Sequence, residues 1–219
     1  MLSSQGMARD QSDDPFMALI RAIAASDESS ASSLLRASPA LATNRAATGA
    51  TRQNAKDYFL DPIGHYIYAG DTALHIAAAA YRTGIARRLV KLGSDVGALN
   101  RRGATPLHYA VDGMPGSATW NPAAQAKVID FLVDAGADPN AMDKGGVTPL
   151  HRAVRNRCAM AVRALLEAGA DPRRKNGNGS TPCDLALENT GRGGSGTLLA
   201  KAQQAEILQL LESSDARRQ

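Results

Sequence analysis

The sequence repeats one short segment four times, and this repetition constrains the fold more than any other feature. Closely related segments begin at Gly70 (GDTALHIAA), Gly103 (GATPLHYAV), Gly146 (GVTPLHRAV) and, in a more divergent form, Gly179 (GSTPCDLAL). The threonines of the first two copies lie 33 residues apart, the next interval is 43, and the last is 33 again. A period of this length predicts a repeat protein, in which each copy is a small unit that stacks on its neighbours.

Each copy carries the signals of a helix start. A threonine side chain can cap a helix N-terminus, and proline suits the first helical position; the threonines are Thr72, Thr105, Thr148 and Thr181, and all but the first precede a proline. A second apolar segment follows, such as VIDFLVDAG, and ends on a glycine that accepts the left-handed conformation. The polar stretch after it, such as ADPNAMDKGG, suits a turn. The unit is therefore predicted to be helix–turn–helix followed by a hairpin-like loop.

The period of 33 together with T-P-L-H-x-A resembles the ankyrin repeat. The resemblance covers roughly two thirds of the chain and is weakest in the unit near residue 177. It implies an all-α fold, an α-solenoid of about five units joined by β-hairpin-like loops. It also implies that His75, His108 and His151, which recur in register, bond to turn backbone and connect adjacent units.

The remaining sequence is divided by the same spacing. We expect units at about 14–46, 68–100, 101–143, 144–176 and 177–212, with flexible tails at 1–13 and 213–219. Inserted segments are expected at about 45–67, at Gly113–Pro122 and around TGRGGSGTLL. GRGGSG (191–196) follows no readable strand and lacks the lysine of a phosphate-binding loop, so a flexible connector is predicted there.

No residue pattern supports catalysis, a cofactor or a metal. Histidines in a stacked column lie about 8–10 Å apart, whereas zinc–ligand bonds are near 2 Å. No nucleophile elbow or C-x-x-C is present, although an enzyme with a site built from the insertions remains an alternative. His65, which lies in an insertion, is expected to be a surface loop residue. Cys183 stands where sister units have leucine and is expected to be buried.

The positions that packing does not require fall on hairpin tips and on the exposed side of each first helix. In the ankyrin family these surfaces line a concave groove that binds partner proteins. Many of them are basic here, which indicates a partner with an acidic segment. The candidate partner-binding residues are Arg101, Arg102, Tyr109, Asp112, Trp120, Lys144, Arg152, Arg155 and Asn156, with Glu188 beside them. Aromatic residues such as Trp120 concentrate in the insertions, where they either pack the loops down or form a contact surface.

Charge leaves one further alternative. The net charge of +4 and the pI of about 9.3 permit weak binding to nucleic acid or another polyanion, but acidic residues are interspersed among the basic ones. Two cysteines without ligand spacing indicate reduced thiols, and no apolar run suits export or a membrane span. We therefore expect a soluble, cytoplasmic, monomeric protein without enzymatic activity that binds another protein; the sequence has no readable signal for delivery into a host cell.

Overall fold

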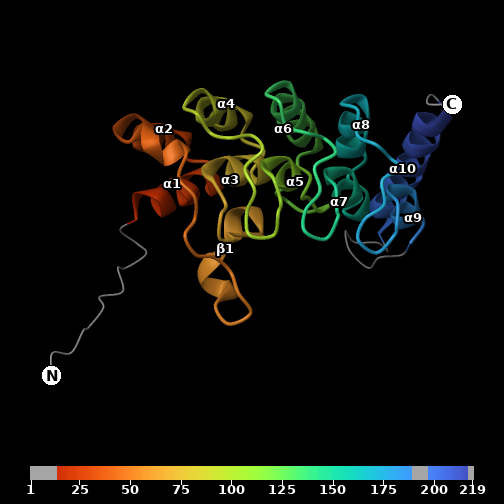
Figure 1. Ribbon diagram of the computed structural model, residues 1–219, viewed down its shortest axis with the longest axis horizontal. Helices are drawn as coiled ribbons and strands as arrows, with labels where there is room; N and C mark the ends of the chain where they lie inside the picture. Colours follow the sequence, from red (N-terminus) through yellow and green to blue (C-terminus); the bar gives the residue numbers. More distant parts are fainter. Residues whose placement is uncertain (1–13, 189–196, 217–219) are drawn as a thin grey trace.

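A computed structural model describes residues 14–188 and 197–216, and within them the chain forms ten α-helices arranged as five pairs. Figure 1 shows the pairs side by side along the long axis of the molecule. The helices are α1 (Pro15–Ala24), α2 (Glu28–Ala37), α3 (Ala73–Ala79), α4 (Thr83–Lys91), α5 (Pro106–Ala110), α6 (Pro122–Asp134), α7 (Pro149–Arg155), α8 (Ala159–Glu167), α9 (Pro182–Leu187) and α10 (Leu198–Ala216). The prediction of an all-α repeat solenoid is confirmed.

The stack has two layers of helices. First helices contact first helices, as in α3 with α5 and α7 with α9, and second helices contact second helices, as in α6 with α8 and α8 with α10. The hairpin-like loops project on one side (Figure 1). Helix α10 includes residues 213–216 of the segment that was predicted to be a tail. The predicted tail at 1–13 and the predicted connector at 191–196 lie outside the described residues.

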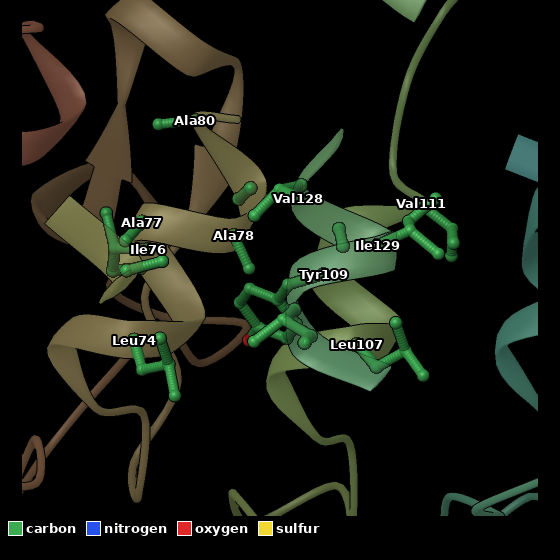
Figure 2. Packing of buried hydrophobic residues seen from close by; sticks show 14 of the residues in the cluster. Leu74, Ile76, Ala77, Ala78, Ala80, Leu107, Tyr109, Val111, Val128 and Ile129 are labelled. Carbon is green, nitrogen blue, oxygen red and sulfur yellow. The ribbon is translucent and has the colours of Figure 1, made fainter. Parts of the chain in front are cut away.

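The core follows the repeat. Leu74, Leu107 and Leu150 occupy the same position in three successive units, and each is fully buried. Figure 2 shows Ala78 of α3 facing Tyr109 of α5 and Val128 of α6 in the next unit. Small residues bring the helices close, and each large buried side chain contributes on the order of 1.5–3 kcal/mol. Each unit therefore buries its apolar face against its neighbours.

The recurrent histidines have the role expected of them. In each, Nδ1 accepts the backbone N–H of the capping threonine, at 3.1 Å for His75, 3.1 Å for His108 and 3.2 Å for His151. Nε2 reaches a carbonyl of the following unit, namely Ala104 at 3.1 Å, Val147 at 2.9 Å and Ser180 at 3.1 Å respectively. Because one nitrogen accepts and the other donates, these imidazoles are neutral. They cap their own helix and fasten it to the next unit.

The insertion at 45–67, hereafter the strap, contains two 3-10 helices, η3 (Ala55–Tyr58) and η4 (Asp61–Ile63), in addition to η2 (Pro39–Ala42), which precedes it. Strands β1 (Phe59–Leu60) and β2 (His65–Tyr66) pair antiparallel, with Phe59 opposite Tyr66 and Leu60 opposite His65. The strap lies on the same side as the hairpin-like loops (Figure 1). Its base is fixed because Tyr58, Leu60 and Ile67 are buried.

Candidate functional site

A groove of about 1410 Å³ runs along the first helices and the hairpin-like loops. Residues 62–66 of the strap line one part, and residues 113–114 and 117–122 of the insertion between α5 and α6 line another. The loops around Arg102 and Lys144 form the mouth. These loops approach closely because Gly103, at φ +75°, leaves room that a Cβ would not, since a Cβ there would lie 2.9 Å from the Lys144 nitrogen.

The floor of the groove holds a network of charged side chains around Asp112. One carboxylate oxygen of Asp112 lies 3.0 Å from His65 Nε2 and 3.7 Å from Arg152 Nη1, and the other accepts from Asn156 Nδ2 at 3.3 Å. Arg152 also donates to Asp143 at 3.0 Å. Burial alone would raise the pKa of Asp112, but the hydrogen bond from His65 and the charge of Arg152 hold that pKa below its usual range. Arg152 therefore stays charged between two carboxylates.

Tyr109 belongs to the floor and not to the exposed helix face on which the sequence placed it. Its ring is 1% exposed, so the expectation of an accessible tyrosine is corrected. The hydroxyl donates to Asp71 at 2.9 Å and accepts from Asn100 Nδ2 at 2.9 Å. The ring lies 4.4 Å from that of His65, measured between centroids. The preceding unit has the apolar residue Ile76 at the equivalent position. Tyr109 therefore places a buried polar network where that unit has only apolar packing.

The expectation that His65 is a surface loop residue is also corrected. Its side chain is 14% exposed and reaches from the strap to the floor, whereas a surface position was expected. His65, Asp71 and Asn100 were not predicted from the sequence to be site residues. A signal was present for Asp71, because the matching positions hold Ala104, Val147 and Ser180, none of them charged.

The exposed basic residues gather at the mouth. Arg101 donates to the Ala50 carbonyl of the strap, and its guanidinium lies 5.4 Å from the ring centroid of Tyr68. Arg102 lies 5.0 Å from the same ring and donates to its hydroxyl at 3.2 Å. Lys144 is exposed on the next loop, and its backbone N–H donates to the Arg102 carbonyl at 2.9 Å. These three predicted residues therefore lie together, while Arg155 is half-buried further along the groove.

The aromatic residues of the insertions divide between packing and exposure. Tyr58 is buried and bonds to Thr48 at 2.9 Å, which fixes the strap. Trp120 is half-buried in the groove lining and its Nε1 donates to Gln125 at 3.4 Å. Tyr66 is 38% exposed. Packing of the insertions is therefore seen for Tyr58, whereas a contact surface formed by the more exposed aromatic residues stays a prediction.

The described residues contain no group of three His, Cys, Asp or Glu side chains placed to share a metal ion. Cys183, expected to be buried, is half-buried, whereas Cys158 is fully buried and burial raises its pKa to about 12. Over the described part of the chain, no helix has both the length and the apolar character that spanning a bilayer requires.

Comparison with protein families gives three overlapping matches. The model described as ankyrin repeats (3 copies) matches residues 19–120, the model of the single ankyrin repeat matches 102–144, and the model described as ankyrin repeats (many copies) matches 132–186. No curated protein matches the chain. The matched residues include the strap, the groove floor and both loops of the mouth.

Proposed function

The chain belongs to the ankyrin-repeat family, and from this premise we propose that it binds an acidic segment of a partner protein in the groove. Ankyrin repeats are in general protein–protein interaction modules and are typically non-catalytic. The finer assignment, which concerns the groove, its mouth and the chemistry of the partner, depends on the charges of this particular chain.

One observation carries the proposal: the groove has an excess of positive charge that its own carboxylates do not neutralise. Among the described lining residues, six are Arg or Lys and two are Asp; they are Arg82, Arg101, Arg102, Lys144, Arg152 and Arg155 against Asp112 and Asp143. Both carboxylates contact Arg152. The remaining cations thus give the groove a positive potential that attracts acidic segments and favours their binding.

The mouth supplies the contacts that make such binding selective for protein. Arg101 and Arg102 both lie against the Tyr68 ring, and an arginine–aromatic cluster is the kind of surface that contributes most to protein interfaces. The stack and its loops are ordered by backbone bonds between units, so that little conformational entropy is lost when a partner arrives. Trp120 adds a partly exposed apolar surface at the other side.

Selection from a library of displayed random peptides tests this assignment directly. The wild-type chain is expected to enrich peptides rich in Asp and Glu. The double variant Arg102→Glu/Lys144→Glu reverses charge at the mouth and is expected to lose that enrichment. Arg152 is unsuitable for reversal because its guanidinium joins Asp112 and Asp143.

A matched control is Lys91→Glu/Lys201→Glu, which changes the net charge equally at exposed positions outside the groove lining. If the control loses acidic peptides as completely as the mouth variant, net charge and not the groove is responsible. Retention of double-stranded DNA by the wild-type chain at physiological salt, without acidic peptide enrichment, would favour the polyanion alternative instead.

A further inference from the structure

The tip of the strap covers part of the groove. Residues Pro62, Ile63 and Gly64 line the groove at the tip, and His65 follows them in β2 and reaches Asp112 on the floor. His65 also lies against the ring of Tyr109, which helps to make Tyr109 inaccessible. The floor of the groove is therefore closed by a residue of the same chain at this point.

The hydrogen bonds of His65 differ from those of the three repeat histidines. Nδ1 lies 2.8 Å from the Tyr66 carbonyl oxygen, and Nε2 lies 3.0 Å from a carboxylate oxygen of Asp112. Both partners are acceptors, so both nitrogens must carry a proton, and the imidazole must be cationic. A neutral ring would leave one nitrogen lone pair facing an oxygen lone pair. The closed position of His65 thus requires its protonation.

The surrounding charges agree with this assignment. Asp112 faces His65 from the segment after α5, and Asp71 lies nearby, before α3. Tyr109 of α5 and His75 of α3 are the titratable groups on the neighbouring first helices, and Arg152 and Arg155 of α7 act on the same Asp112. Burial of His65 would lower its pKa, but the hydrogen bond and charge of Asp112 outweigh burial, and the pKa is raised above the ordinary 6.5.

We propose that the strap tip is a pH-sensitive cover of the groove: protonated His65 holds it closed on Asp112, and loss of the proton releases it and exposes Tyr109. The inference rests on the proposed function because it concerns access to the same groove. A group whose pKa is raised by folding contributes stability below its ordinary pKa and loses it as the pH rises through the folded value. The cover is therefore closed in mildly acidic solution and opens at higher pH, above 6.5.

The opening affects the tip and not the whole strap. Tyr58, Leu60 and Ile67 remain buried, and Arg101 still holds the Ala50 carbonyl. Asp112 keeps Arg152 and Asn156 as partners, so no buried carboxylate is left alone. Loss of the proton removes one positive charge from the floor, and release of His65 uncovers the part of the Tyr109 ring on α5 that its imidazole contacts.

Nitrogen-15 NMR of the full chain with labelled histidine tests the cover without any partner. At pH 6, His65 is expected to show two protonated nitrogens, and His75, His108 and His151 one each. His65 is expected to titrate with a midpoint above 6.5, and the amide signals of Gly64, Tyr66 and Tyr109 are expected to shift with the same midpoint. Broadening of the Tyr109 ring signals by a soluble gadolinium chelate is expected to increase above that midpoint.

Two variants separate the cover from a general effect of pH. Asp112→Asn is expected to lower the midpoint of His65 and of the three amides together, and His65→Gln is expected to abolish the amide shifts. A single protonated nitrogen on His65 at pH 6 would overturn the proposal, and so would titration of His65 with the Tyr109 ring equally shielded throughout. Because no peptide is present, this failure is distinguishable from failure of the peptide selection.

Discussion

Acid destabilisation through His108 is the prediction that the structure specifies most closely. His108 is fully buried, accepts the Thr105 N–H through Nδ1 and donates to the Val147 carbonyl through Nε2. Burial, together with the charge of Arg152, lowers the pKa of His108 to about 4. Protonation would place a second N–H against the N–H of Thr105 and weaken the cap.

The magnitude follows from linkage between protonation and folding. In the unfolded chain the pKa of His108 returns to about 6.5, so that the unfolded state binds the proton first as the pH falls. A tenfold difference in proton affinity corresponds to about 1.4 kcal/mol, and the full effect of His108 is roughly 3 kcal/mol below pH 4. Between pH 7 and pH 5 the expected loss of unfolding free energy is ~2 kcal/mol.

The variant His108→Gln isolates this contribution. Glutamine at the third helical position completes a capping box with Thr105 without titrating, and its amide can also donate toward Val147. Urea unfolding of both proteins at pH 7 and pH 5 measures the free energy. The wild-type chain is expected to lose ~2 kcal/mol more than the variant over this interval. Equal losses in the two proteins would refute the claim that a buried, neutral His108 joins the units.

Three further outcomes are expected. Tyr109→Phe removes a buried hydroxyl bonded to Asp71 and Asn100, and should cost about 1–3 kcal/mol in urea unfolding. Arg157→Met removes the guanidinium of a residue that is 1% exposed and that donates to the carbonyls of Ala186 in α9 and of Glu188 just after it; hydrogen exchange should show α9 opening more often while α3 is unchanged. In a Cys183→Ser background, Cys158 should react with Ellman's reagent only as fast as the chain unfolds, since burial raises its pKa to about 12.

The stacking of the repeat units was predictable because it depends on residues that recur at the same position in several units. The threonine, the histidine three positions later and the leucine between them give the cap, the connection between units and the core, so the order of helices and the column of histidines could be stated from the sequence. The insertion between α5 and α6 was also visible, since Gly113–Pro122 lengthens one interval from 33 to 43. The structure confirms the fold that this spacing indicated, and the family models confirm the family.

The residues of the groove floor could not be predicted from the sequence, because the floor depends on contacts between residues far apart in the chain. His65 and Asp112 are 47 positions apart, and no periodic pattern connects them. Tyr109 was assigned to an exposed face of its helix, but the residue is 1% exposed, and its ring lies against both His75 of α3 and His65 of the strap. An insertion has no counterpart in the other units, so its folded position cannot be inferred from the repeat.

Departures from the repeat nevertheless converge in space, and this connects the sequence to the site. Four positions after the capping threonine the successive units hold Ile76, Tyr109, Arg152 and Leu185; the middle two build the groove floor. Seven positions after it they hold Ala79, Asp112, Arg155 and Glu188; the first three line the same groove, and only the middle two of these four bring charge to it. At these positions the side chain varies, while the capping threonine and, in three successive units, the buried leucine and the bridging histidine that follow it are kept. The two central units can therefore differ in charge and aromatic content without loss of the fold, which is the physical condition for one scaffold to present a particular binding surface.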